Sequence, residues 1–182
     1  MKSENHAELN AKGWSATITA LVAAMECDFD RLEELRDELQ ALDDDCADAE
    51  CDPVLTARNR ADWLKENEEE FKDLTDAATV DGDLMESADA VRERIQQSPL
   101  SVQVRSGWAN PGDEMVAEDF EILLSTGGPA LRIMGELDEH KQPHRAWLEY
   151  QDWGTPWTAF HGEGAASQAD LVAFASCFYF GE

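Results

Sequence analysis

Apolar residues recur at helical spacing through the first part of the chain. Steps of four and three residues connect Trp14, Ile18, Leu21, Met25, Leu32, Leu35, Leu39 and Leu42, with one break at Asp28 beside Phe29. Such steps place side chains on one face of a helix and are typical of a heptad seam. The pattern favours one long helix over residues 7–44. An alternative stays open, because Asp30 and Glu33 have the spacing of a capping box that would start a new helix there.

A second helix is expected after a polar turn over Asp43–Asp52. Asp52 and Pro53 are typical of an N-cap followed by proline at the first helical position. The helix then runs to about Ala77, and its inward-facing positions are Ala57, Ala61, Leu64, Phe71 and Leu74. Together the two helices would form an antiparallel hairpin. A third, shorter helix is indicated by the helical spacing of Leu84, Ala88, Val91 and Ile95.

The pattern changes after Ser98-Pro99, where the proline prevents a helix from continuing. Short apolar or alternating segments, bounded by turn residues, then cover residues 100–104, 120–124, 130–134 and 145–150. Segments of this kind predict an antiparallel meander of four strands. The glycine-rich stretch Thr126–Pro129 and the stretch Trp153–Pro156 are expected to be turns.

A last helix, from Gln168 to about Phe178, carries an apolar face that can cover one side of this sheet. The predicted fold is therefore α+β: an acidic helical hairpin and a short helix, then a four-stranded antiparallel sheet covered by a C-terminal helix. The expected regions are residues 1–98 and residues 99–182.

The charge of the chain is far from that of an ordinary globular domain. Its 182 residues include 40 Asp and Glu but only 14 Lys and Arg, so the formal net charge is −26. A folded chain with this excess of one sign repels itself, although 43% hydrophobic residues and six tryptophans can still form a core. The acidic excess argues against direct binding to nucleic acid or to anionic membranes. It favours a basic protein as the partner.

The expected compartment is the cytoplasm. No apolar run is long enough to span a membrane, and the residues Met1–Asn5 lack the basic flank and apolar stretch of a secretory signal. The cysteines are too scattered for a disulfide framework; they are Cys27, Cys46, Cys51 and Cys177. We therefore expect free thiols.

Ten acidic residues of the predicted hairpin are the candidate partner-binding site. They are Glu33, Glu34, Asp37, Glu38, Asp43, Asp44, Asp45, Glu68, Glu69 and Glu70. An α-helix rises about 1.5 Å per residue, so acids three to five residues apart form rows with spacings of about 5–7 Å. One strand of DNA carries a phosphate per about 3.4 Å of helix axis. These rows can imitate a phosphate backbone; the alternative is an ordinary solvated surface, although such surfaces usually mix both signs.

The sequence offers little for metal or cofactor chemistry. His140 and His144 lie around Pro143 in a predicted loop, and the pair Cys46 and Cys51 lacks a second pair of ligands. We expect neither a metal site nor a cofactor.

Catalysis is equally weakly indicated. Glu149 and Asp152 could form a carboxylate pair, but the aromatic residues around them are better explained by packing. We expect no catalytic residue and a protein that is not an enzyme. Exposed aromatic residues would be natural anchors for a partner; the candidates are Trp108, Trp153, Trp157 and Tyr179.

Several motifs resemble a known family. They are SVQVRSGW (Ser101–Trp108), FEILLSTGGPALRI (Phe120–Ile133), RAWLEYQDWGTPWT (Arg145–Thr158) and FYFGE (Phe178–Glu182). These runs resemble a family of small proteins encoded by bacteriophages, prophages and plasmids. The run ECDFDRLEELRDEL (Glu26–Leu39) is similar to the acidic helical segment that often precedes that module. The resemblance implies an accessory protein of a mobile element, a setting rich in acidic inhibitors of host restriction and CRISPR systems.

Charge and context together predict a counter-defence protein that acts by DNA mimicry. Its expected target is a basic host complex, with a CRISPR surveillance complex first and a restriction enzyme second. The alternative is an acidic scaffold or assembly protein that interacts through its heptad seam. A homodimer is left open.

Overall fold

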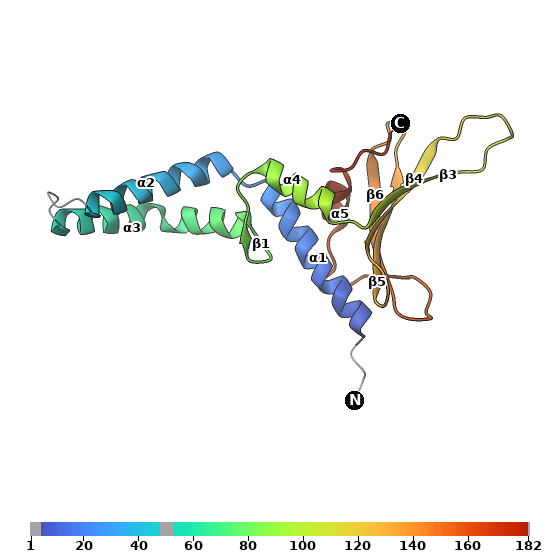
Figure 1. Ribbon diagram of the computed structural model, residues 1–182, viewed down its shortest axis with the longest axis horizontal. Helices are drawn as coiled ribbons and strands as arrows, with labels where there is room; N and C mark the ends of the chain where they lie inside the picture. Colours follow the sequence, from blue (N-terminus) through green and yellow to red (C-terminus); the bar gives the residue numbers. More distant parts are fainter. Residues whose placement is uncertain (1–4, 48–52, 182) are drawn as a thin grey trace. The chain divides into compact units, whose positions relative to one another are not determined.

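The fold is α+β, as Figure 1 shows for the computed structural model, which describes residues 5–47 and 53–181. The helices of these residues are α1 (His6–Met25), α2 (Phe29–Ala47), α3 (Pro53–Ala78), α4 (Ala88–Gln97) and α5 (Gln168–Ala175). A short hairpin consists of β1 (Thr79–Val80) and β2 (Asp83–Leu84). The main sheet contains β3 (Ser101–Ser106), β4 (Ala117–Ser125), β5 (Ala130–Leu137), β6 (Pro143–Gln151) and β7 (Thr158–Ala159).

Contacts divide the chain into two compact units. The sheet unit contains Met1–Val22 and Val91–Glu182, and the hairpin unit contains Ala23–Ala90. The regions expected from composition divide the chain at Ser98-Pro99, whereas the contacts group most of α1 and α4 with the sheet.

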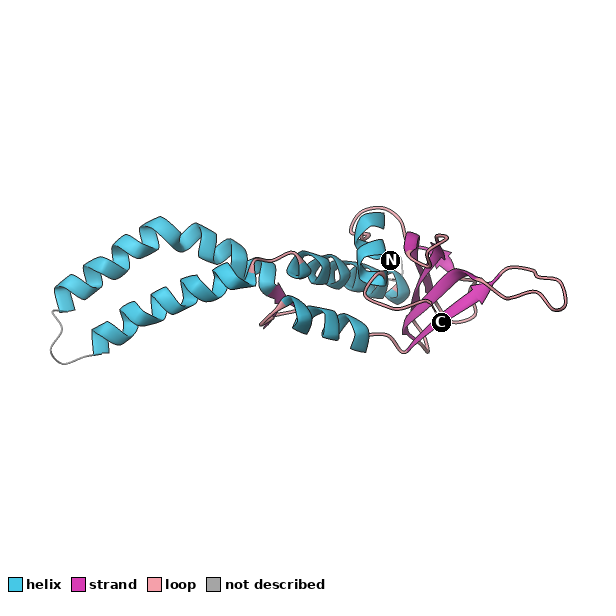
Figure 2. Cartoon of the chain, turned by 90° about the horizontal axis from the view of Figure 1, so that it is seen from above, coloured by secondary structure: helices cyan, strands magenta, loops and turns pink. Residues whose placement is uncertain are grey.

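The five strands of the sheet unit form a simple meander in which each strand pairs antiparallel with the next. Alternate residues of β4, β5 and β6 are buried, so one face of the sheet supplies the core. In Figures 1 and 2 the helices α1, α4 and α5 lie on the same side of this sheet. Their buried residues Ile18, Ile95 and Phe174 complete the core on that side.

Local signals start the helices of this unit. The side chain of Asn5 accepts a hydrogen bond from the backbone N–H of Ala7 at 3.1 Å, at the start of α1. Ser167 and Asp170 form a reciprocal capping box at the start of α5. Both caps satisfy N–H groups that the first turn of a helix leaves without a partner.

The hairpin unit is built on α2 and α3, which run side by side in Figure 1 and in Figure 2. Leu32 and Leu35 of α2 are buried. On α3, the half-buried side chains are Leu64, Phe71 and Leu74. These residues confirm the predicted hairpin, but Ala57 and Ala61, which were expected to face inward, are exposed.

The prediction of one continuous helix over residues 7–44 is wrong. The helix stops at Met25, and α2 begins at Phe29. Asp28 causes the restart, because its side chain accepts a hydrogen bond from the backbone N–H of Arg31 at 3.0 Å. The alternative restart at Asp30 and Glu33 lies two residues too late. The preserved seam spacing therefore continues across two separate helices.

Other boundaries also differ from the predictions. The helix α2 continues to Ala47 through part of the expected polar turn, and residues 48–52 lie outside the described residues. Leu84 belongs to β2 and not to the third helix, because Ser87 caps α4 through the backbone N–H of Ala90. The sheet gains a fifth strand, β7, which is two residues long and follows the predicted turn at Trp153–Pro156.

Candidate functional site

The candidate site is the exposed surface of α2 and α3 in the hairpin unit. These two helices contain fifteen acidic and six basic residues, a formal charge of −9. Three of the bases are paired with acids of the same helices. Arg31 bonds to Glu70, the Nε atom of Arg60 lies 2.7 Å from Asp43, and Arg58 lies 3.9 Å from Asp62. The remaining acids greatly outnumber the bases.

A row of acids follows the outer face of α3. It contains Asp62, Glu66, Glu69, Asp73 and Asp76, all of them exposed. Each member of the row lies two residues before or after one of the packing positions Leu64, Phe71 and Leu74. Two residues correspond to about 200° around a helix, so the row lies opposite the packed face. We call these five residues the α3 row.

A second row follows α2 in the same way. It contains Asp30, Glu33, Asp37 and Asp44, and Gln40 fills the missing position; all five are exposed. Gln40 donates a hydrogen bond to the Asp44 carboxylate at 2.8 Å. This row is displaced by two residues from Leu32 and Leu35 and therefore also lies opposite the packed face. We call its four acids the α2 row.

Arg31 pairs with two of the predicted site residues, both of which stay exposed to solvent. Its guanidinium donates to both carboxylate oxygens of Glu70, at 3.0 and 3.2 Å, and to Glu34 at 3.2 Å. These hydrogen bonds hold the pKa of the Glu70 carboxyl below its usual value. They also raise the pKa of Arg31. The Arg31–Glu70 pair thus joins α2 to α3, whereas the Arg31–Glu34 pair lies within α2. Both carboxylates are less available to a partner.

Two more predicted residues have partners across the hairpin. The indole N–H of Trp63 donates to Glu38 at 2.9 Å, and the Nε atom of Arg60 donates to Asp43 at 2.7 Å. Four others have no side-chain hydrogen bond or ion pair within the described part of the chain: Glu33, Asp37, Glu68 and Glu69. The side chain of Asp45 lies outside the described residues.

The ten predicted residues therefore overlap the two rows only in part. Glu33, Asp37 and Asp44 belong to the α2 row, and Glu69 belongs to the α3 row. The prediction omitted Asp30, Asp62, Glu66, Asp73 and Asp76. Choosing clusters of adjacent acids caused the omission, because adjacent residues on a helix point in different directions. The helical spacing used to find the apolar seam would have found both rows.

The heptad seam has a structural role within the chain. Ile18 and Leu21 are buried in the sheet unit, and Leu32 and Leu35 are buried in the hairpin unit. A scaffold that pairs through this seam would need these side chains to be exposed.

The possible carboxylate pair of Glu149 and Asp152 is occupied by other interactions. Glu149 accepts hydrogen bonds from Arg132, at 2.7 and 2.9 Å, and from the indole N–H of Trp147 at 2.9 Å. Asp152 lies in an exposed turn and accepts from the backbone N–H of Trp153 at 2.8 Å. Arg132 also stacks over Trp157, with the guanidinium carbon 4.2 Å from the ring centre. This arrangement fixes the side chains on the sheet.

The other candidate ligands are dispersed. Within residues 5–47 and 53–181, no group of three or more His, Cys, Asp or Glu side chains could hold a metal ion. His140 and His144 contact Glu139 and Glu136 separately, at 3.5 and 3.6 Å. Cys27 and Cys177 are thiols without a disulfide within the described residues, and the pKa of each is raised, chiefly by burial. The side chains of Cys46 and Cys51 lie outside the described residues.

Exposed aromatic residues gather in the sheet unit. Trp108 is fully exposed, and Trp153 and Tyr179 are more than three-quarters exposed, whereas Trp157 is half-buried beneath Arg132. Trp153 lies directly against Gly128, where its indole occupies the space that a Cβ would need.

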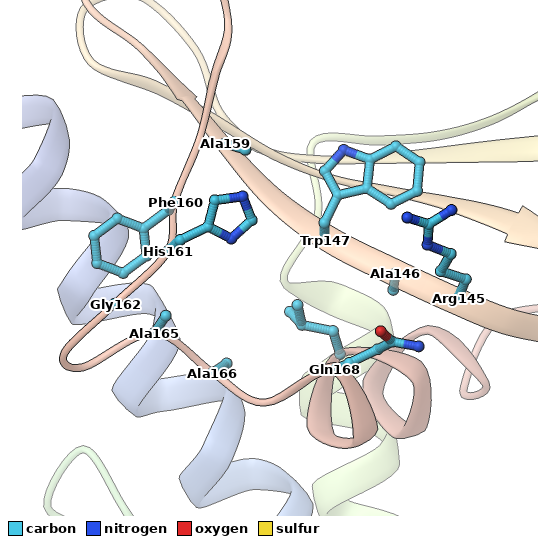
Figure 3. A pocket seen from close by; sticks show the side chains of 11 residues that line it. Arg145, Ala146, Trp147, Ala159, Phe160, His161, Gly162, Ala165, Ala166 and Gln168 are labelled. Carbon is cyan, nitrogen blue, oxygen red and sulfur yellow. The ribbon is translucent and has the colours of Figure 1, made fainter.

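A pocket of about 460 Å³ lies between the first half of β6, the segment 159–166 and the start of α5 (Figure 3). Arg145, His161 and Gln168 supply its polar groups, and Trp147 forms part of its wall. None of the described lining residues carries a carboxylate, a thiol or a hydroxyl group. The pocket therefore lacks a side-chain nucleophile with an activating carboxylate.

None of the helices that the structure describes combines the length and the apolar character needed to cross a bilayer. No protein-family model matches the chain, and neither the curated proteins nor the solved structures contain a match. The resemblance to the phage and plasmid family stays a prediction that rests on its motifs.

Proposed function

We propose that this protein is a non-enzymatic inhibitor that occupies the nucleic-acid-binding groove of a basic host defence complex. The observation that carries the proposal is the pair of acidic rows on α2 and α3, each opposite the packed face of its helix. Because the packed faces meet between the helices, the rows lie on opposite outer sides of the hairpin. Two negatively charged rows on a rod are also the pattern of the two backbones of a duplex.

The charge density of the α3 row supports the comparison. Asp62 to Asp76 covers fourteen residue steps, or about 21 Å along the helix axis. One DNA strand carries about six phosphates over the same length. The row places five carboxylates there. A groove lined by Lys and Arg would therefore meet a similar number of charges on α3 as on one strand of its target.

A CRISPR surveillance complex is the first target of this proposal, and a restriction enzyme is the second. Both classes hold DNA through its backbone charges. The resemblance to proteins of mobile elements supports a target among host defences. A scaffold that uses the heptad seam has less support, because Leu32 and Leu35 are buried within the chain.

The experiment measures how much of this protein displaces a labelled target duplex from a purified surveillance complex. The test variant reverses four acids of the α3 row: Glu66→Lys, Glu69→Lys, Asp73→Lys and Asp76→Lys. The control variant reverses four exposed acids of the sheet unit: Glu8→Lys, Glu114→Lys, Glu139→Lys and Glu163→Lys. Both variants change the net charge by the same amount, so they separate the position of the charge from its total. Circular dichroism verifies that each remains folded.

Exposed ion pairs contribute about 0.2–1 kcal/mol each. Losing four, and replacing them with repulsion, should weaken displacement by about 30-fold or more, whereas the control should stay within a few-fold of the parent. If the folded α3-row variant displaces the duplex as well as the parent, the α3 row is not part of the contact surface, and the proposed imitation of two backbones by two rows is wrong. The same assay with a restriction enzyme tests the second target.

A further inference from the structure

The strand β3 is an unprotected edge of the main sheet. Within the described residues it pairs only with β4, and it carries six residues. The opposite edge, β7, is only two residues long. A free edge exposes backbone N–H and C=O groups that can pair with another strand, and proteins usually guard such edges with short strands or charged side chains. The edge at β7 is short, whereas β3 is six residues long and its one charged side chain, Arg105, is engaged by Asp119 of β4.

The composition of β3 is exceptional for this chain. The 19 residues from Arg94 to Gly112 contain no Asp or Glu, although acids make up 40 of the 182 residues. Other long acid-free stretches belong to α1 and to β4 and β5, whose side chains form much of the core. In β3, by contrast, Val102 is 39% exposed and Val104 is 51% exposed. This is an apolar, acid-free surface on an otherwise strongly acidic protein.

The backbone groups of the two valines point away from β4. In an antiparallel ladder, hydrogen-bonded and non-hydrogen-bonded pairs alternate. The bond from the N–H of Phe160 to the C=O of Leu148 fixes this alternation at one end of the sheet. We followed the alternation from strand to strand through the four pairings of the sheet. The backbone N–H and C=O groups of Gln103 then point toward β4, and those of Val102 and Val104 point outward.

We propose that β3 pairs with β3 of a second copy of this chain, antiparallel across a two-fold axis at Gln103. The sequence Ser101-Val102-Gln103-Val104-Arg105 has the same order of polar and apolar residues in both directions. In this register Val102 lies opposite Val104 of the second copy, and each exchanges backbone hydrogen bonds with it. Gln103 lies opposite its own copy, and Ser101 lies opposite Arg105.

Side-chain charges are compatible with this register. The only charged residue of β3, Arg105, is already paired with Asp119 of β4. It meets the neutral Ser101 of the second copy, so no like charges face each other. The valines of both copies form one apolar strip on the helix-covered side of the joined sheets. A second copy of β3 is thus the occupant that matches the edge in backbone direction, polarity and charge.

The net charge of each copy gives the dimer an unusual salt dependence. Two chains of −26 repel each other over a distance set by the Debye length, which falls from about 30 Å at 0.01 M to about 8 Å at 0.15 M salt. Dimerisation should therefore strengthen as salt is added. Binding of the acidic rows to a basic partner should weaken under the same change.

Analytical ultracentrifugation of the full chain, at low salt and at 0.5 M NaCl, tests the proposal. We expect a larger dimer fraction at high salt. Val104→Lys should abolish the dimer, because it places a charge in the apolar strip. Val104→Pro should abolish it by removing an outward-facing N–H, a change that an edge strand tolerates. Leu84→Lys is the control, because it introduces the same charge at an exposed apolar residue of the hairpin unit. It should leave the dimer intact.

A cysteine cross-link tests the register. In a non-hydrogen-bonded pair the Cα atoms lie about 4.5 Å apart, which is within the range of a disulfide. Gln103→Cys should therefore give a dimer linked by a disulfide. After digestion, the peptide that contains position 103 should be found joined to the same peptide of the second copy. Val104→Cys should not cross-link to itself, because the register places it opposite Val102.

A chain that stays monomeric at high salt and millimolar concentration would overturn the proposal. So would a dimer that survives both Val104 variants. The proposal is independent of the proposed function, and the two can fail separately. Val104→Lys should leave duplex displacement intact, and reversal of the α3 row should leave the dimer intact.

Discussion

Replacing Leu35 with Asp should unfold the helical hairpin while the main sheet stays folded. Leu35 is completely buried. Removing a buried leucine side chain costs about 2–5 kcal/mol, and an unpaired carboxylate in its place adds several kcal/mol. At the usual 0.05–0.15 kcal/mol per residue, the hairpin unit Ala23–Ala90 is stable by about 3–10 kcal/mol. The substitution therefore removes most or all of the stability of this unit.

Hydrogen exchange followed by mass spectrometry gives the required resolution. In Leu35→Asp, peptides from α2 and α3 should lose protection, and peptides from β4, β5 and β6 should keep it. Gln40→Asp is the control, because it adds the same charge at an exposed position of α2. Protection of α2 and α3 at the level of the parent in Leu35→Asp would refute the packing of Leu35 between the helices.

Three further predictions concern particular side chains. Arg31→Ala should raise the pKa of Glu70 toward its ordinary value in an NMR titration, because the Arg31 hydrogen bonds hold that pKa low. In the parent these hydrogen bonds stabilise the folded protein at neutral pH, and this stabilisation is lost as the pH falls through the lowered pKa. An unchanged pKa would show that the pair does not form in solution. Gly135→Ala should destabilise the sheet unit by about 1–3 kcal/mol in chemical denaturation, because the added Cβ collides with a buried aromatic ring and a backbone carbonyl. Gly13→Ala, which meets nothing within 4 Å on α1, should be neutral or stabilising by up to about 1 kcal/mol, and equal effects at the two sites would contradict this reasoning. Cys177 should react with iodoacetamide at pH 8 more slowly than a peptide thiol, because burial raises its pKa; equal rates would mean that the thiol is exposed.

The sequence pattern predicted most of the sheet, because β4, β5 and β6 contain alternating or continuous apolar residues and are separated by clear turn residues. It could not locate β7, since two residues carry no readable period. The hairpin of β1 and β2 could have been predicted. Asp81 and Gly82 have positive φ angles of 52° and 87°, and Asp-Gly between two short strands is a strong signal for such a turn.

The helix break shows the limit of periodicity. The seam keeps its phase from Trp14 to Leu42, yet Asp28 starts a new helix by capping it. Periodicity reports which side chains share a face, and it does not report whether the backbone between them is continuous. The capping preference of Asp was a readable signal, but the pattern alone could not decide whether capping or helix continuation would prevail.

The acidity of the hairpin was readable from the sequence, whereas the arrangement of its acids in two rows was not predicted. The hairpin carries the acids, as expected, but pairing with Arg31, Arg60 and Trp63 engages several of the predicted residues. Such pairing depends on how α2 and α3 align, which cannot be read from either helix separately. The two rows became recognisable once the packed face of each helix was known.

The most direct test of DNA mimicry is whether this protein and DNA compete for one site. The measurement is the amount of this protein bound to a surveillance complex, repeated at increasing concentrations of target duplex. Mimicry predicts that the complex binds either DNA or this protein, so the amount of protein bound to the complex should fall in proportion as DNA is added. Protein that stays bound to the complex at saturating DNA, or that fails to bind at all, would contradict the account.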